Sequence, residues 1–135
     1  MDLEDIGFLR LHSQFIANQP FATPEKVVDY MGAMQAQDFA GALWSIGLRT
    51  KDATIKTVEK AISDRKIVRS WPMRGTLHFV ASENLRWMIK LLAPRIIAGS
   101  AGRHKQLGLD ESVFLKSLKL LEKALADGKQ LTGDE

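Results

Sequence analysis

The chain has 135 residues, no cysteine and a formal net charge of +3. This length predicts one domain with a real core, and the lack of cysteine excludes disulfides and thiolate metal sites. No apolar run approaches the length of a membrane span and the first residues are acidic, so the sequence predicts neither a membrane helix nor a signal peptide, and we expect a cytoplasmic protein.

Apolar residues at helical spacing predict a helical first half. The predicted helices are residues 6–17, a helix that opens at Pro24 and ends around Met34, residues 39–48, and a helix capped by Asp52 or Thr54. In the fourth helix we expect Ile55, Val58 and Ile62 to face the core. The third helix contains Trp44 and is predicted to be largely buried.

A short hairpin is the only clear strand signal. The β-type runs Ile67–Trp71 and Thr76–Val80 flank Pro72 and Gly75, residues that end strands and supply turn geometry. A small hairpin on a helical core is typical of a winged helix. We therefore predict a mainly α fold: a helix-turn-helix plus a short β-hairpin, with additional C-terminal helices.

After the hairpin the sequence predicts further helices. Ser82 is a predicted N-cap, and Pro94 is expected to kink that helix or to start a new one. A clear amphipathic helix is predicted over about residues 110–127. The apolar stripe that we expect it to bury consists of Phe114, Leu118, Leu121 and Leu125.

Three regions are predicted along the chain. They are a winged-helix unit (1–81), a helical extension packed on it (82–128) and the start of a truncated second unit (129–135). The last region rests on Thr132 and Glu135, which have the spacing of a capping box. It implies that the chain is the first part of a longer protein, and the alternative is a disordered polar tail.

The sequence contains none of the familiar catalytic motifs, and its three histidines lack metal-ligand spacing. The remaining polar candidates are Gln35 and Gln37, which lie in apolar surroundings. From the residues alone, such a pair is more often two solvated or helix-end amides than a site. Both interpretations stay open at this point.

Basic residues cluster at the hairpin, where they could bind a nucleic-acid phosphate backbone. A basic face that only contacts solvent is an equally good interpretation of the charge alone. The candidate DNA-binding residues are Arg65, Lys66, Arg69, Arg74 and His78. His78 is also readily interpreted as a hydrogen-bonded structural residue. We expect the tryptophans at positions 44, 71 and 87 to anchor the core rather than to stack on bases, with Trp71 as the exception because it lies in the hairpin.

Two stretches together resemble a known family. Residues 34–44, MQAQDFAGALW, and residues 69–78, RSWPMRGTLH, are similar to the signature of the bacterial winged-helix DNA glycosylases of the AlkZ and AlkX (YcaQ-like) group. The resemblance extends loosely from Leu9 to the C-terminus. It implies three tandem winged-helix units with a concave, positively charged DNA-binding surface, in a protein more than twice as long as this chain.

The resemblance also implies a role for the two glutamines. AlkZ-like members have a catalytic Gln-x-Gln motif, which Gln35 and Gln37 match at both positions, whereas AlkX-like members have an acid at the second. The implied activity is that of a monofunctional glycosylase that excises N7-alkylated or crosslinked purines from double-stranded DNA without a cofactor or metal. The sequence does not specify the lesion.

Two other functions remain compatible with the sequence. The first is a non-catalytic winged-helix DNA-binding module, such as a transcriptional regulator, whose fourth helix enters the major groove. The second is a protein-interaction module with an incidental basic face.

Overall fold

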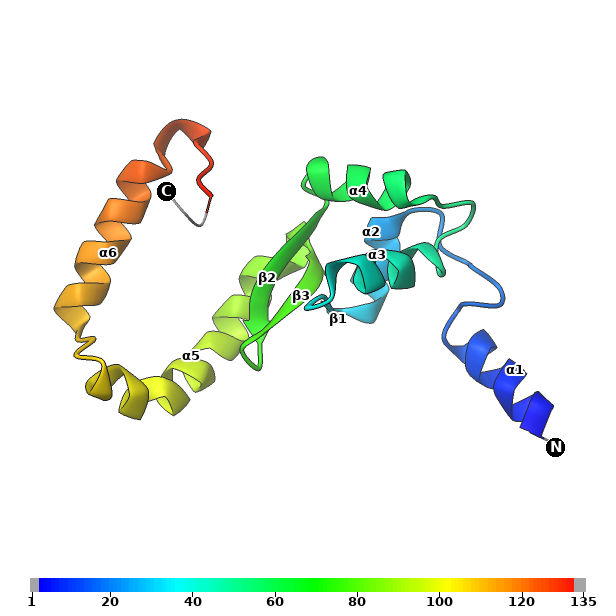
Figure 1. Ribbon diagram of the computed structural model, residues 1–135, viewed down its shortest axis with the longest axis horizontal. Helices are drawn as coiled ribbons and strands as arrows, with labels where there is room; N and C mark the ends of the chain where they lie inside the picture. Colours follow the sequence, from blue (N-terminus) through cyan, green and yellow to red (C-terminus); the bar gives the residue numbers. More distant parts are fainter. Residues whose placement is uncertain (1–2, 133–135) are drawn as a thin grey trace. The chain divides into compact units, whose positions relative to one another are not determined.

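The computed structural model describes residues 3–132 and divides the chain into two compact units, one up to Ile96 and one from Ile97 onward. Figure 1 shows the elements in chain order. They are α1 (Leu3–Ser13), α2 (Pro24–Met31), β1 (Met34–Gln35), α3 (Phe39–Gly47), α4 (Ile55–Ser63), β2 (Ile67–Met73), β3 (Thr76–Ala81), α5 (Ser82–Gln106), α6 (Glu111–Ala124) and the 3-10 turn η1 (Ala126–Gly128).

The first unit has a winged-helix arrangement, as the sequence predicts. Helices α2, α3 and α4 pack against one another, and α2 and α4 also contact the β2–β3 hairpin (Figure 1). Their shared core is continuous because each helix supplies an apolar stripe. The largest fully buried side chains in it include Phe79, Ile46, Ile67, Val27, Val28 and Val58.

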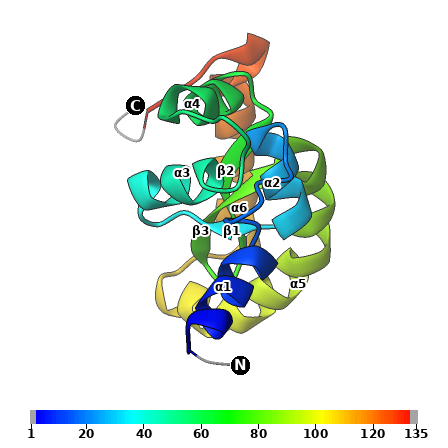
Figure 2. The same cartoon turned by 90° about the vertical axis from the view of Figure 1, so that its right-hand side faces the viewer.

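The sheet has one strand more than the sequence analysis predicts. Strand β1 pairs antiparallel with β3, giving the order β1-β3-β2, and Figure 2 shows β1 beside β3 with α2 and α3 close to it. The prediction that the second helix reaches Met34 is wrong, because the helix ends at Met31. Gly32 follows with φ +74°, a left-handed conformation that glycine adopts without a Cβ clash and that cannot continue a helix.

The hairpin turns at two residues. Arg74 (φ 52°) and Gly75 (φ 67°) both lie in the left-handed region, the geometry of the tight turns that join twisted antiparallel strands. A shift in register between Ser70 and Met73 accommodates Pro72 on β2, which has no backbone N–H to donate.

Three expectations about burial are wrong. Trp44 and Trp87 are each more than half exposed, so they do not anchor the core, and Trp71, the expected exception, is exposed as well. Ile55, the first residue of α4, is also exposed, whereas Val58 is buried and Ile62 packs against the core. Ile55 lies in the first turn of α4, before the residues of that helix that pack against the core.

Helix α5 runs through Pro94 as one element, so no new helix starts there. Pro94 lacks an N–H and its ring crowds the carbonyl four residues earlier, which weakens the helix locally, but the helical backbone continues past it. The predicted region boundary falls at Ser82, where α5 begins, whereas the compact units divide after Ile96, within α5.

The second unit contains the amphipathic helix α6. Asp110 caps α6 by accepting a hydrogen bond from the backbone N–H of Val113, at 3.0 Å. The expectation that its stripe is buried is wrong, since Phe114, Leu118, Leu121 and Leu125 are each about half exposed. The spacing of the apolar residues predicts the helix but does not show whether another element covers its apolar face. The capping-box prediction depends on Glu135, which lies outside the described residues.

The described part of the chain, residues 3–132, contains no helix that is both long enough and apolar enough to span a membrane.

Candidate active site

The two glutamines lie on a non-helical segment between α2 and α3, residues 32–38, which we call the glutamine segment and which contains strand β1. Gln35 pairs with His78 in the β1–β3 ladder, and the Ala36 N–H donates to the Leu77 carbonyl at 2.8 Å. Because side chains two residues apart share a side in extended backbone, both amides face the same way. The Gln35 Nε2 donates to the Gln37 Oε1 at 2.5 Å.

This geometry distinguishes a joint site from the alternative. A continuous helix through Asp38 would place side chains two residues apart on nearly opposite faces. The structure instead has an extended segment, as a joint site requires, and the amides are in direct contact. A catalytic role for the pair stays a proposal.

Both amides open onto one shallow cleft of about 350 Å³ at the N-terminus of α3. Its lining residues are Gln35, Gln37, Asp38, Gly41, Ala42 and Ser45. The sequence analysis does not include Asp38 and Ser45. Asp38 could have been found, because an aspartate directly before an apolar helical run is a typical N-cap. Ser45 carries no such signal.

Asp38 fixes the start of α3. Its Oδ1 accepts a hydrogen bond from the Gly41 N–H at 3.1 Å, which satisfies a donor that would otherwise lack a partner in the first helical turn. The cap keeps the carboxylate against the helix and holds residue 38 in extended backbone, with φ −82° and ψ 106°. The chain therefore leaves the glutamine segment in a defined direction.

Gly41→Ala is expected to break this cap. A Cβ at position 41 would lie 2.4 Å from Asp38 Oδ2, so the carboxylate must rotate away from the helix end. We expect the free energy of unfolding of this variant to be about 1 kcal/mol lower than that of the control described next, the usual cost of losing a cap. Thermal melting followed by circular dichroism measures it.

The matched control is Gly47→Ala, also in α3, where an added Cβ meets nothing within 4 Å. This change should be neutral or stabilising by up to about 1 kcal/mol, because alanine favours helix more than glycine does. Equal melting temperatures for the two variants would show that the Asp38 cap contributes nothing.

Arg69 on β2 reaches across to the glutamine segment. Its Nε and Nη2 both donate to the Ala36 carbonyl, at 2.9 and 2.7 Å, and Nη2 also lies 3.3 Å from the Gln37 carbonyl. Its guanidinium carbon lies 5.4 Å from the centre of the Phe39 ring, within range of a cation–π contact. This predicted phosphate ligand is therefore hydrogen-bonded to the backbone beside the glutamines.

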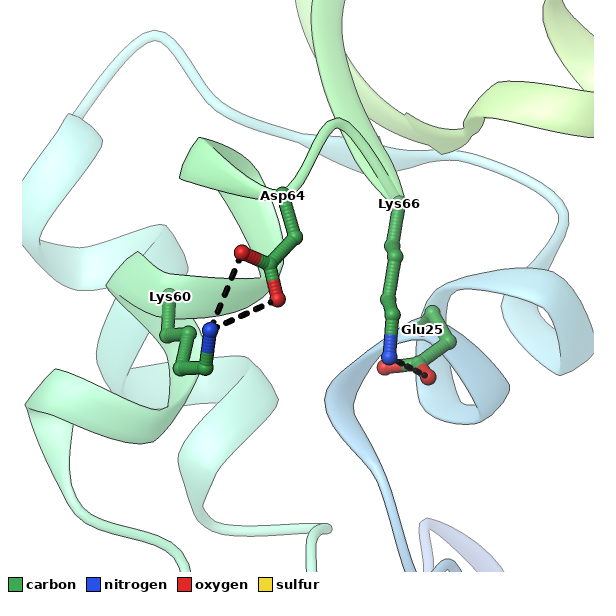
Figure 3. A network of polar contacts seen from close by, with 4 residues as sticks. All are labelled: Glu25, Lys60, Asp64 and Lys66. Atoms are coloured by element: carbon green, nitrogen blue, oxygen red, sulfur yellow. Dashed lines mark hydrogen bonds and ion pairs between the residues drawn. The ribbon is translucent and has the colours of Figure 1, made fainter.

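The other candidate DNA-binding residues have different surroundings. Arg74 at the hairpin turn and Arg65 just before β2 are exposed and both have positive φ. Lys66 forms an ion pair with Glu25 at 3.3 Å, shown in Figure 3 beside the neighbouring Lys60–Asp64 pair. The partial burial of Glu25 raises the pKa of its carboxyl, but hydrogen bonds from the backbone and from Lys66 outweigh burial and leave that pKa below its ordinary value.

His78 is 2% exposed, and its Nδ1 lies 2.8 Å from the Thr76 carbonyl. His78 lies on β3, the central strand of the sheet, which pairs with β1 and β2. Its ring is buried, so almost no ring surface is accessible to a ligand. The structural interpretation of His78 fits this geometry better than a DNA contact. We therefore leave His78 out of the interface proposed below.

Among residues 3–132, no group of three or more histidine or acidic side chains is placed to hold a metal ion. The polar groups that line the cleft are two amides, one carboxylate and one hydroxyl. Such groups can orient a water molecule and stabilise charge that develops close to them.

Comparison with known proteins identifies the family of this chain. The family model described as "DNA glycosylase AlkZ-like" matches residues 28–135, which include both glutamines, the hairpin and Arg69. The chain belongs to the AlkZ-like DNA glycosylase family, as the two sequence motifs predict.

Two matches come from Streptomyces sahachiroi. The "Interstrand DNA cross-link repair glycosylase" of Streptomyces sahachiroi is 26% identical over 84 residues, which are 62% of this chain and 23% of that protein. The solved structure of "Streptomyces sahachiroi DNA glycosylase AlkZ" matches with a TM-score of 0.47 and 28% identity, over 53% of this chain and 19% of that chain. The chain thus spans less than a quarter of the curated relative.

Proposed function

We propose that this chain is the N-terminal winged-helix part of a monofunctional DNA glycosylase that excises N7-alkylated or crosslinked purines from double-stranded DNA in the cytoplasm. Membership of the AlkZ-like family supports the general class of DNA repair glycosylase. The observation that carries the proposal is the shared cleft, onto which Gln35 and Gln37 both open while in contact with each other.

The amides suit a lesion that is already a good leaving group. A purine alkylated at N7 carries a positive charge, so the bond from the sugar to the base can break without a general acid. What remains is to hold a water molecule at the sugar carbon and to stabilise the cationic sugar, a task of orientation and electrostatics.

The hydrogen bond between Gln35 and Gln37 leaves donors and acceptors on both amides free to bind that water. Each glutamine amide has two donors and an oxygen with two lone pairs, and the bond between Gln35 and Gln37 uses one donor and one lone pair. The free Gln35 oxygen can accept a hydrogen bond from the water while the Gln37 amide nitrogen donates to the water oxygen, and the proton that the water loses on attack passes to bulk solvent. This hydrogen bond also limits the rotamers of both side chains. The two amides are therefore already oriented before the water binds.

The DNA contacts are proposed for the exposed cations at the hairpin. Arg74 at the turn, with Arg65 and Lys66 before β2, would bind phosphates rather than read bases, because the hairpin offers charge without a set of side chains arranged for base edges. Affinity should then be modest and strongly dependent on salt.

Arg74→Ala is expected to weaken binding to all duplex sequences about equally. Losing one phosphate contact should also reduce the slope of log K against log salt concentration by about 1. Fluorescence anisotropy with two unrelated duplexes at several salt concentrations measures both effects. A loss of affinity confined to one of the duplexes would indicate direct base readout instead.

The experiment that tests the proposed function uses the intact gene product and a duplex carrying one N7-methylguanine. We expect release of free N7-methylguanine, detected by mass spectrometry, and one abasic site for each base released. Salt-dependent binding without release would support a regulator and refute the glycosylase. The absence of salt-dependent binding would support an interaction module and refute both DNA functions.

A further inference from the structure

We propose that Arg69 is a positioning residue of this site: it clamps the backbone of the glutamine segment so that Gln35 and Gln37 share one cleft. The inference rests on the proposed function and goes beyond it, because it assigns the reaction geometry to a residue that does not line the cleft. It also replaces the phosphate-binding role that the sequence alone predicts for Arg69.

The residue between the two glutamines is held on three sides. The Ala36 N–H donates to the Leu77 carbonyl on β3, and the Ala36 side chain is fully buried. The remaining group, the Ala36 carbonyl, accepts two hydrogen bonds from Arg69. With all three groups held, the peptide units on both sides of Ala36 have little freedom to rotate.

Arg69 holds the next residue as well. Its contact with the Gln37 carbonyl and its position against the Phe39 ring extend the clamp to the start of α3. The segment makes no regular ladder beyond Gln35, since β1 ends there. Arg69 therefore supplies, from 32 residues away in the sequence, the hydrogen bonds that a longer strand would supply.

A lysine cannot reproduce this arrangement. Arginine presents several N–H groups in a rigid plane and can donate to two carbonyls at once, whereas the lysine ammonium is a single charge on a flexible stem. Arg69→Lys keeps the positive charge that a phosphate would need but loses the planar fork. The substitution therefore separates the two roles.

The test compares Arg69→Lys with wild type in the intact gene product, measuring DNA affinity and the single-turnover rate of N7-methylguanine release separately. We expect the rate to fall about 10- to 100-fold, the usual effect of a small misplacement of catalytic groups, with affinity changed less than about twofold. Arg86→Lys, an exposed arginine on α5 outside the site, is the matched control and should change neither value.

Amide hydrogen exchange gives a second readout that does not need activity. In Arg69→Lys the backbone amide of Ala36, which donates to the Leu77 carbonyl, should exchange faster than in wild type, whereas those of β2 and α4 should not. Arg69→Gln, which removes the charge as well, should show the same local change if the clamp is the role of Arg69. The melting temperatures of both variants establish that they are folded.

Each other outcome has a defined meaning. Reduced affinity with an unchanged single-turnover rate in Arg69→Lys would make Arg69 a phosphate ligand and overturn the inference. Unchanged exchange at the Ala36 amide would also overturn it. If wild type releases no base at all, the proposed function fails, while the exchange result still decides whether Arg69 is a clamp.

Discussion

Replacing Gln37 with alanine is expected to lower the single-turnover rate of base release by about 100-fold or more, an effect comparable to losing one preorganised hydrogen-bonding group from an active site. The substitution removes the partner of Gln35 and one of the two groups that would hold the attacking water. Affinity for damaged duplex should change less than twofold, because phosphate contacts elsewhere supply most of it. Single-turnover kinetics with saturating protein separate the rate from the affinity.

The control for this prediction is Gln130→Ala, an exposed glutamine beyond η1 and outside the cleft. It should retain the wild-type rate and affinity. A Gln37→Ala variant that excises at the wild-type rate would remove Gln37 from the mechanism. A variant that only binds more weakly would make Gln37 a DNA contact instead.

A second large effect is expected in the core. Phe79 is 0% exposed at the middle of β3, opposite Met34 on β1 and Arg69 on β2, and its ring centre lies 5.7 Å from that of Phe39. It therefore joins the hairpin, the glutamine segment and α3. Phe79→Ala should cost about 3–5 kcal/mol, through lost burial and the cavity left behind.

A loss of that size is a large part of the stability of an ordinary domain, about 5–15 kcal/mol. We expect the melting temperature to fall by at least about 10 °C, or the variant to be unfolded at 25 °C. Phe8→Ala removes an equally large ring from an exposed position on α1 and should have little effect. Similar melting temperatures for both variants would show that Phe79 does not join the three elements.

The sequence predicts the regular elements well, because their signals are local. Thr54 caps α4 through a reciprocal pair with Thr57, and the apolar spacing that follows marks the helix. The hairpin strands and their turn at Arg74 and Gly75 also follow from short-range patterns. Strand β1 has only two residues and is defined by its long-range pairing with β3, so no local pattern reveals it.

Burial is predicted less well than structure type. The stripe of α6 has a clear helical period, yet Leu118 and Leu121 are exposed, and so is Trp44 on the predicted buried helix. A period indicates which side chains share a face and does not show what covers that face. Exposed aromatic residues are also common on protein surfaces, which limits any inference from residue type alone.

The site was predicted in part. The condition that both glutamines require extended backbone follows from side-chain geometry, and Gly32 satisfies it by ending α2 early. The link between Arg69 and the Ala36 carbonyl joins residues 33 positions apart in the sequence. From its charge alone, Arg69 on a predicted hairpin indicates phosphate binding. Its contact with the backbone at Ala36 depends on the position of the planar guanidinium in the folded chain, which the sequence does not show.

The most direct test of a shared catalytic site is a double-mutant cycle on Gln35 and Gln37, measured as single-turnover release of N7-methylguanine. If both amides orient one water molecule, each single variant should lose most of the rate enhancement, and the double variant should be about as slow as the slower single variant. Independent, multiplicative losses would mean that the glutamines act separately. Excision that survives undiminished in the double variant would contradict the shared site altogether.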